Sequence, residues 1–413
     1  MRKLKQNQWI PKKRYKPVSP DGIFVTFVVY LFLFWMDKLL LSGGLSFIIV
    51  FFSIPVIIQV AKEKRLYDEP GERKIHKSVV PTLGGLGIFA GFMMAFLLFT
   101  PIHSYPELQF FIAACMIIFF LGLKDDILVL SATKKFAGQL MAAALLFKFG
   151  GVQLTSMHGF LGLQEMPYGI GMVVTILTIV MITNSFNLID GVDGLAGGLG
   201  ILTSMTFGIF FFLIGQSIHA IMAIALTGGL LAFLIYNAAP AKIFMGDTGS
   251  LLVGLINAIL VIHFINISSI SGTPNFIPSA PAIGFSVLMI PLFDTLRVFS
   301  LRILSRRSPF SPDRNHIHHF LLDLGFSHNK VTLIIILTNA LFMGIAYLLK
   351  GMGTTQVLAV LVLLGLSFTS VVYFLRNKRL AQKTNDEKKS ENENSSKVLK
   401  LVTDTMQAEQ HFK

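Results

Sequence analysis

The sequence contains few charged residues and a single cysteine. Asp, Glu, Lys and Arg make up 14% of its 413 residues, against about 25% in soluble domains, which excludes an ordinary soluble domain. Cys115 alone cannot form a disulfide within the chain, and its apolar surroundings indicate a packing role. What is abundant is apolar: 53% of the residues are hydrophobic, with 38 Phe and 35 Gly. This composition is typical of a membrane protein with closely packed helices.

Long apolar runs recur along the whole chain. Because lipid offers no hydrogen-bond partners to the backbone, a run of about 20 apolar residues predicts a transmembrane helix. We therefore predict an all-α, polytopic transmembrane bundle with eleven or twelve spans. Twelve is preferred, with Ser42-Gly43-Gly44 as the turn between the first two. The expected spans cover residues 23–41, 45–61, 82–101, 108–123, 133–149, 170–189, 194–214, 218–236, 249–267, 279–304, 330–349 and 354–375.

The distribution of positive charge predicts the orientation of the chain. Lys and Arg gather in the tails and in alternate loops, which marks the cytoplasmic side of a membrane protein. The net charge of +13 therefore does not imply a nucleic acid partner. We expect a basic cytoplasmic tail over 1–22, a transmembrane catalytic domain over 23–376, and a polar cytoplasmic tail over 377–413. That last tail is expected to be disordered except near 397–406, and 150–169 is expected to form a small hairpin on the outer surface.

Three acidic clusters interrupt the apolar runs, all in loops predicted for one side of the membrane. They are Asp125-Asp126, the series Asn184, Asn187, Asp190 and Asp193, and Asp247 within Phe244-Met-Gly-Asp-Thr-Gly-Ser250. A carboxylate at the edge of the hydrocarbon layer is costly without a cation or partner. Mg²⁺ prefers oxygen ligands, commonly one or two carboxylates with substrate phosphates. The clusters thus predict a shared cation, although a solvated helix end or an N-cap also explains each aspartate taken alone.

Two basic loops are predicted on the same side. One contains Arg73, Lys74, His76 and Lys77, and the other follows Arg297 and Arg302 and contains Arg314, His316, His318 and His319. The second suits binding of a diphosphate. Zinc binding by the three histidines is an alternative, but the cysteine or acidic partner expected at structural-zinc spacing is missing. A solvated basic loop that obeys the positive-inside rule is the other alternative.

Five ordered motifs between about 45 and 375 carry a resemblance to a known family. They are the basic loop ending in Pro81-Thr-Leu-Gly-Gly85, the aspartate pair, the Asn/Asp-Gly series, the Phe244–Ser250 loop and His316-Ile-His-His319. Together they resemble the polyprenyl-phosphate N-acetylhexosamine-1-phosphate transferases, glycosyltransferase family 4. The loop 308–319 resembles the branch that uses UDP-N-acetylglucosamine and undecaprenyl phosphate. The related phospho-N-acetylmuramoyl-pentapeptide transferases, the alternative within the superfamily, usually carry Pro-Phe-His-His-His there.

The resemblance implies a reaction and a role for each residue. The lipid phosphate attacks the UDP-sugar, UMP leaves, and a lipid-linked sugar diphosphate begins a cell-envelope polysaccharide. Mg²⁺, or Mn²⁺, would lie among Asp125, Asp126 and Asp247, with Asp125 favoured as the proton acceptor. Lys77, Asn184, Asn187, Asp190, Asp193 and Phe244 would hold the nucleotide, and Arg314, His316, His318 and His319 would hold phosphate or sugar. A route through a covalent aspartyl intermediate stays open.

The resemblance also implies a location in the bacterial cytoplasmic membrane, with the active site facing the cytoplasm. A homodimer is compatible with the sequence. Two other classes compete with the transferase. An ion-coupled transporter would place its carboxylates near the bilayer midplane on broken helices, whereas here they cluster at one face. An intramembrane aspartyl protease would need two aspartates inside two helices and no histidine-arginine loop.

Overall fold

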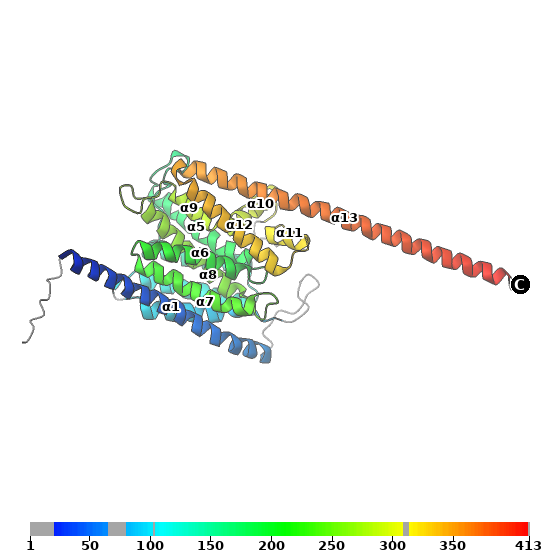
Figure 1. Cartoon of the computed structure of the whole chain (residues 1–413), viewed down its shortest axis with the longest axis horizontal. Helices are drawn as coiled ribbons and strands as arrows, with labels where there is room; N and C mark the ends of the chain where they lie inside the picture. The colour runs from blue at the N-terminus through cyan, green and yellow to red at the C-terminus, as the bar shows by residue number, and fades with distance from the viewer. Residues whose placement is uncertain (1–19, 65–79, 102–103, 309–313, 412–413) are drawn as a thin grey trace, which may run out of the picture.

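The computed structural model describes residues 20–64, 80–101, 104–308 and 314–411, and these form a bundle of helices (Figure 1). An isolated antiparallel bridge between Ser156 and Glu165 is the only extended pairing in the described part, and it closes the hairpin expected over 150–169. The α-helices are α1 (Pro20–Glu63), α2 (Gly84–Phe99), α3 (Leu108–Ile127), α4 (Ala132–Phe149), α5 (Tyr168–Ile189), α6 (Leu195–Leu213), α7 (Ser217–Asn237), α8 (Gly246–Ser268), α9 (Ala280–Val287), α10 (Met289–Leu304), α11 (Ile317–Asp323), α12 (His328–Leu348) and α13 (Thr354–His411).

The first two expected spans are one helix, so the predicted turn at Ser42-Gly43-Gly44 is wrong. α1 continues through both glycines. Gly43 allows close contact between α1 and α7 instead of forming a turn. A Cβ atom on Gly228 of α7 would lie 2.0 Å from the Gly43 carbonyl oxygen. The two ends of α1 lie at opposite ends of the bundle (Figure 1). One helix, not the two expected spans, therefore precedes the loop 62–81. Of the expected tail 1–22, residues 1–19 lie outside the described part of the chain.

Seven described helices are long and apolar enough to cross a membrane, fewer than the eleven or twelve spans expected. They are α1, α5, α6, α7, α8, α12 and α13, and an eighth results if α9 and α10 count as one bent span. α2 has only 16 residues, and α4 contains three lysines. The remaining expected spans still coincide with helices of the bundle. The chain is thus a multi-pass membrane protein, with helix boundaries close to those predicted from α2 to α12 apart from the break between α9 and α10.

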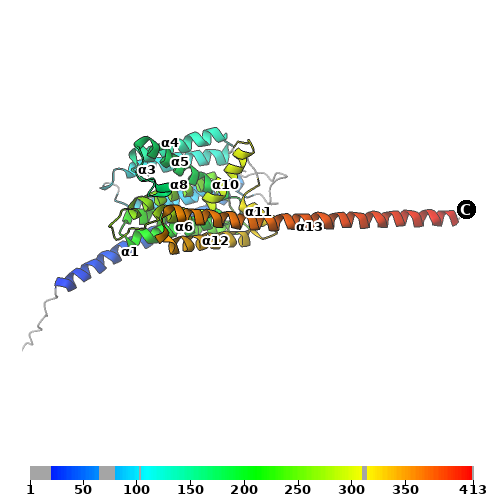
Figure 2. The same cartoon turned by 90° about the horizontal axis from the view of Figure 1, so that it is seen from above.

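The most enclosed helix is α8, which packs against α5, α3 and α2. In its most apolar stretch 78% of the residues are buried, against 22% for α1. Figure 2 shows α8 between a layer that contains α3, α4 and α5 and a layer that contains α6, α12 and α13. A central helix that begins with an aspartate places that side chain where several other helices end.

The expected span 279–304 is broken at Leu288. The segments α9 and α10 meet at an angle of 87°, and Asn339 of α12 occupies the break. Its side chain accepts a hydrogen bond from the Ile290 N–H (2.9 Å) and donates one to the Val287 carbonyl (3.0 Å). These bonds satisfy backbone groups that lipid could not satisfy. The bend directs α10 toward the end of the bundle that carries α11.

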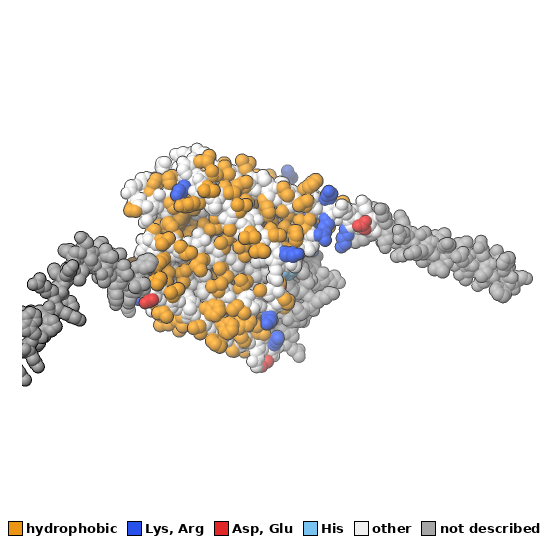
Figure 3. Space-filling view, viewed as in Figure 1, with side chains coloured by type: hydrophobic (Ala, Val, Ile, Leu, Met, Phe, Trp, Pro, Cys, Tyr) orange, Lys and Arg blue, Asp and Glu red, His pale blue; other side chains and the backbone are white. Residues whose placement is uncertain are grey.

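The C-terminus differs from the expected disordered tail. α13 is a single helix from Thr354 to His411. The segment 377–411 contains neither proline nor glycine, so no residue in it interrupts a helix that packing has already started. Figure 3 shows hydrophobic side chains over the lateral face of the bundle and most of the Lys and Arg of that face at the end where α13 leaves it.

Candidate active site

Four helix ends meet at the end of the bundle from which α13 extends. α3 ends with Asp125 and Asp126, α5 ends just before Asp190, and α8 begins with Asp247. The first turn of α4 adds Lys135. The three acidic clusters, separated by more than 50 residues of sequence, are therefore neighbours in the folded chain, as the sequence predicted.

The centre of this group is an ammonium between two carboxylates. The Nζ atom of Lys135 lies 2.5 Å from Asp125 Oδ2 and also forms an ion pair with Asp247 Oδ2. The second oxygen of each aspartate is used as well. Asp125 Oδ1 accepts the Leu130 N–H (2.6 Å), and Asp247 Oδ1 accepts the Asn187 amide (2.8 Å). Asp125 and Asp247 thus converge on one position and hold a positive charge there.

Asp126 has a different set of partners. Its two oxygens accept the backbone N–H groups of Asp247 (2.7 Å) and Thr248 (3.0 Å) and the Thr248 hydroxyl (2.5 Å). It therefore caps the start of α8, where unpaired N–H groups favour an anion. Gly246 makes this contact possible: its φ is +71°, and a Cβ there would lie 2.7 Å from the Asp126 carboxylate. The structure does not place Asp126 with Asp125 and Asp247 around Lys135.

The polar series at the end of α5 faces the same region. Asn184 donates to Gln139 of α4 (2.6 Å), and Asn187 contacts both Asp247 and Ser250. Asp190 accepts a hydrogen bond from the Gly246 N–H, and burial together with the carboxylates of Asp247 and Asp126 raises its pKa well above the ordinary value. The three-residue spacing thus places successive side chains on one face, as expected.

Asp193 does not belong to this face. Its carboxylate accepts the Ala241 N–H (3.2 Å) and lies 3.3 Å from Nδ1 of His328, and only 5% of the residue is exposed. The Thr332 hydroxyl donates to its backbone carbonyl. These contacts join the start of α6 to the start of α12 and to the loop before α8. A structural role explains the position of Asp193 better than the predicted contact with nucleotide.

The histidine loop forms the opposite wall. His316 precedes α11, and its Nδ1 lies 2.9 Å from Asp294 Oδ2. His318 is 2% exposed, and burial lowers its pKa to about 3. Burial and the nearby Arg314 also lower the pKa of His319. His318 and His319 are thus neutral near pH 7. Gly191 allows this approach, since a Cβ there would lie 2.8 Å from His318 Nε2.

α11 is held in place by α10 and α13. Arg297 of α10 pairs with Asp294 (2.7 Å), and Arg376 of α13 pairs with Asp323 (2.7 Å). Both guanidinium groups lie against the ring of Phe320, at 5.6 Å and 4.8 Å from its centroid. Two cation–π contacts and the Arg376–Asp323 ion pair therefore fix the short helix that carries His318 and His319, while the Arg297–Asp294 pair lies within α10.

A cavity of about 370 Å³ lies between these walls. Six of the residues predicted from sequence line it, and so do several that were not assigned a role. The predicted lining residues are Asn184, Asn187, Asp190, His316, His318 and His319. The additional polar ones are Lys135, Gln139 and Arg302. Lys135 has a signal in the sequence, because a charged residue inside a predicted span indicates function.

Two predicted residues lie elsewhere, and a third falls outside the described part of the chain. Arg314 is exposed beside His319. Phe244 lies beside the segment before α2, with its backbone bonded to Pro81 and Gly84, and it does not line the cavity of Lys135. Lys77 lies outside the described residues. The basic loop that contains Lys77 leads into Pro81, so the Phe244 contacts place the end of that loop next to α8.

The residues present fit a magnesium site better than a zinc site. Among the described residues, no group of three or more His, Cys, Asp or Glu side chains is arranged to hold a metal ion. Asp125 and Asp247 supply two carboxylates directed at one cation, here the ammonium of Lys135. Two carboxylates completed by substrate phosphates and water are a common Mg²⁺ environment, whereas structural zinc requires four protein ligands.

A separate apolar groove of about 440 Å³ runs along α5 and α10 from the hairpin that contains Leu154 and Phe160, and it shares no lining residue with the cavity. Met181 and Ile182 line the groove one turn before Asn184, and Leu292 and Leu296 line it before Phe299 and Arg302. The same two helices therefore present an apolar surface along their length and polar groups at the cavity.

Comparisons with known proteins identify the family of the chain. The sequence profile of glycosyl transferase family 4 matches residues 108–265. A probable undecaprenyl-phosphate N-acetylglucosaminyl 1-phosphate transferase of Bacillus subtilis is 32% identical over 323 residues, 76% of this chain and 86% of the relative. The decaprenyl-phosphate N-acetylglucosaminephosphotransferase of Mycobacterium leprae is 33% identical over 73% of this chain and 81% of its own length. The undecaprenyl-phosphate alpha-N-acetylglucosaminyl 1-phosphate transferase of Escherichia coli K12 is 29% identical over 83% and 92%. The matched segment contains the helix ends that bring Asp125, Lys135 and Asp247 together, and the chain belongs to glycosyl transferase family 4.

Proposed function

We propose that this protein transfers N-acetylglucosamine 1-phosphate from UDP-N-acetylglucosamine to undecaprenyl phosphate. The products are UMP and a lipid-linked sugar diphosphate, which would begin a cell-envelope polysaccharide. The names of the relatives support the substrate pair, since they are transferases of this class and this chain matches them over most of their length. The structure supports the same reaction through its distribution of charge.

One observation carries the proposal: Asp125 and Asp247 converge on Lys135 beside a cavity whose far side contains Arg302 and His318. A nucleotide sugar carries a diphosphate, which requires cations and hydrogen-bond donors on several sides. Lys135 and Arg302, from α4 and α10, supply two positive charges across the cavity. The carboxylates supply the ligands for a divalent ion that would accompany the diphosphate.

In the reaction, an oxygen of the lipid phosphate forms a bond to the β-phosphorus of the donor. The bond from that phosphorus to the bridging oxygen breaks, and this oxygen leaves with UMP. When bound, Mg²⁺ held by Asp125 and Asp247 would neutralise charge on the diphosphate and on the leaving group. Lys135 would move from the carboxylates toward the phosphates and stabilise the charge that develops there. Asp125 could accept a proton from the lipid phosphate, since its Oδ2 faces the same position as Lys135.

The neutral histidines would act as hydrogen-bond partners and not as charges. The lowered pKa values of His318 and His319 keep both rings uncharged near pH 7. Neutral imidazoles can each donate to a phosphate or sugar oxygen and accept from a hydroxyl. We therefore assign them to orientation of the sugar phosphate. Asp126 would position Asp247 through the cap on α8 and would not bind the metal itself.

The acceptor lipid would occupy the apolar groove along α5 and α10. A polyprenyl chain is uncharged and requires an apolar surface, which Met181, Leu292 and Leu296 provide. A chain in this groove would bring its phosphate to the cavity beyond Asn184.

The distribution of positive charge supports a cytoplasmic position for the site. The site lies at the end of the bundle where most of the visible Lys and Arg gather (Figure 3). An excess of Lys and Arg is typical of the cytoplasmic side of a membrane protein. We propose that the active site faces the cytoplasm in the bacterial inner membrane.

The direct test uses the purified full chain in lipid nanodiscs with UDP-N-acetylglucosamine, undecaprenyl phosphate and Mg²⁺. We expect formation of lipid-linked sugar diphosphate and equimolar release of UMP. UDP-N-acetylmuramoyl-pentapeptide, offered in a parallel reaction, should give no product. Absence of product from folded protein with the first donor would contradict the proposal, and product only with the second would assign the chain to the alternative branch.

A further inference from the structure

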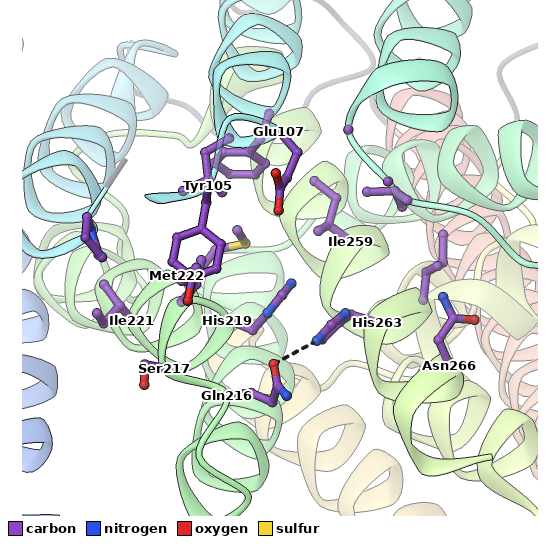
Figure 4. A pocket seen from close by; sticks show the side chains of 18 of the residues that line it. Tyr105, Glu107, Gln216, Ser217, His219, Ile221, Met222, Ile259, His263 and Asn266 are labelled. Carbon is purple, nitrogen blue, oxygen red and sulfur yellow. Dashed lines mark hydrogen bonds between the residues drawn. The ribbon is translucent and has the colours of Figure 1, made fainter. Parts of the chain in front are cut away.

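A second and larger cavity lies at the opposite end of the bundle. Its volume is about 710 Å³, and it is lined by residues of the starts of α3 and α7 and of the last third of α8. Figure 4 shows Glu107, Tyr105, His219, His263 and Gln216 around this space. None of these residues takes part in the site of Asp125 and Asp247.

The position of the cavity along α8 defines its surroundings. Asp247 and His263 are 16 residues apart on this one helix, which corresponds to roughly 24 Å at 1.5 Å per residue. The hydrocarbon core of a bilayer is about 30 Å thick. The second cavity therefore lies near the other membrane interface, within reach of lipid headgroups of that leaflet and of solutes beyond it.

The charge of the cavity is negative. Among its described lining residues, Glu107 alone has a formally charged side chain. Its carboxylate points into the cavity above the two imidazole rings (Figure 4), and it has no hydrogen bond or ion pair with another described residue. Lys148 of the neighbouring helix end lies over the Tyr168 ring, 5.9 Å from the centroid, and not in the cavity. No positive side chain of the described lining offsets Glu107.

The rings below Glu107 are unusually close. His219 and His263 are stacked with centroids 3.5 Å apart and an angle of 8° between their planes. Two rings at this separation repel each other if both are protonated, so the pair does not carry two positive charges. His263 contacts Gln216 Oε1 at 3.4 Å, while His219 Nδ1 is buried without a hydrogen-bond partner in the described part of the chain. A buried ring nitrogen without a partner is costly unless a ligand satisfies it.

We propose that this cavity binds a small organic ammonium group. The Glu107 carboxylate would pair with the charge, Tyr105 and the stacked imidazoles would present aromatic faces to it, and His219 would accept an N–H hydrogen bond. Carboxylate and aromatic faces together are a common environment for alkylammonium ligands. The ammonium could come from the headgroup of an aminoethyl phospholipid or from a soluble amine, and the experiment separates these sources.

The test uses the full chain in nanodiscs of phosphatidylglycerol, which has no amine. In the first arm ethanolamine is titrated and the midpoint of thermal unfolding is recorded. In the second arm phosphatidylethanolamine replaces part of the lipid, and lipid retained by the protein is identified by native mass spectrometry. We expect a rise in the midpoint in the first arm, retention of phosphatidylethanolamine over phosphatidylglycerol in the second, or both. A response in one arm alone identifies the source.

The matched variants are Glu107→Gln and Glu165→Gln. Glu165 is exposed and does not line this cavity. We expect Glu107→Gln to weaken binding at least tenfold and Glu165→Gln to bind as the unmodified chain does. Glutamine has nearly the same shape as glutamate, and the Glu107 side chain has no hydrogen bond or ion pair with the described residues to lose, so both variants should fold. Equal binding by both variants, or no preference for amine in either arm, would overturn the proposal. These readouts do not depend on transferase activity.

Discussion

The two ends of α8 show how one helix serves two different environments. At its start, every oxygen of Asp125, Asp126 and Asp247 has a partner, and the ammonium of Lys135 is shared between two helices. At its far end, Glu107 faces a cavity about twice as large and has no described partner. A site that holds several charges close together has to be internally compensated. A site with one exposed charge requires no such compensation and stays available to a ligand of opposite charge.

The largest effect should come from the compensated end. Asp247→Asn removes one of the two charges that face Lys135, and we expect turnover to fall by about 100-fold or more, the scale of losing one preorganised charged group. The measurement is product formation in nanodiscs, with thermal unfolding as the check on folding. Asp386→Asn, an exposed substitution on α13, is the control. Near-normal turnover in Asp247→Asn would remove this residue from the proposed metal site.

Lys135→Met should have the next largest effect. It leaves Asp125 and Asp247 facing each other without a counterion, and breaking a buried pair in this way costs about 3 kcal/mol or more. We expect both lower turnover and a lower unfolding midpoint, with added Mg²⁺ restoring part of the midpoint. Lys134→Met, on the exposed side of the same turn, should change neither. A midpoint in Lys135→Met that does not respond to Mg²⁺ would contradict a shared cation position.

A smaller effect is expected where α13 supports the histidine helix. Arg376→Ala removes the ion pair to Asp323 and one guanidinium from the Phe320 ring. Because the change acts through His318 and His319, we expect KM for the UDP-sugar to rise several-fold and KM for the lipid to stay constant. Arg376→Lys should restore part of the loss, and the exposed Lys378→Ala is the control. Equal changes in both KM values would indicate general destabilisation instead.

The smallest effect concerns pH. The pKa of His318 is lowered to about 3 in the folded protein, so the unfolded chain takes up this proton first as the pH falls below about 6.5. The contribution of neutral His318 to stability is therefore present above that pH and is lost between 6.5 and 3. The raised pKa of Asp190 instead favours the folded chain as the pH falls. The change in unfolding midpoint of each variant is therefore compared with that of the unmodified chain. His318→Gln should lose less in unfolding midpoint between pH 7 and pH 5; an equal loss would contradict burial of a neutral ring.

The sequence predicts much of the bundle because most apolar runs are single helices. It fails where a residue type has two uses: Gly43 and Gly44 look like a turn, but Gly43 lies inside α1 against α7. The polar composition of 377–411 likewise suggests disorder, yet nothing in it interrupts α13.

The candidate site shows the same limit. Spacing placed Asn184, Asn187 and Asp190 on one face correctly, but adjacency suggested equal roles for Asp125 and Asp126. Only the fold shows that the second caps α8. Lys135 and Arg302 lie in predicted spans, and their partners come from helices distant in sequence, so their convergence could not be read from local pattern.

The most direct test of the account is the Mg²⁺ dependence of lipid-linked product formation in the unmodified chain, in Asp125→Asn and in Asp247→Asn. We predict turnover that disappears with EDTA and returns with Mg²⁺ in the unmodified chain, and that requires more Mg²⁺ or stays near background in both variants. Turnover that persists in EDTA, or identical Mg²⁺ titrations for all three proteins, would contradict a magnesium site built from the ends of α3 and α8.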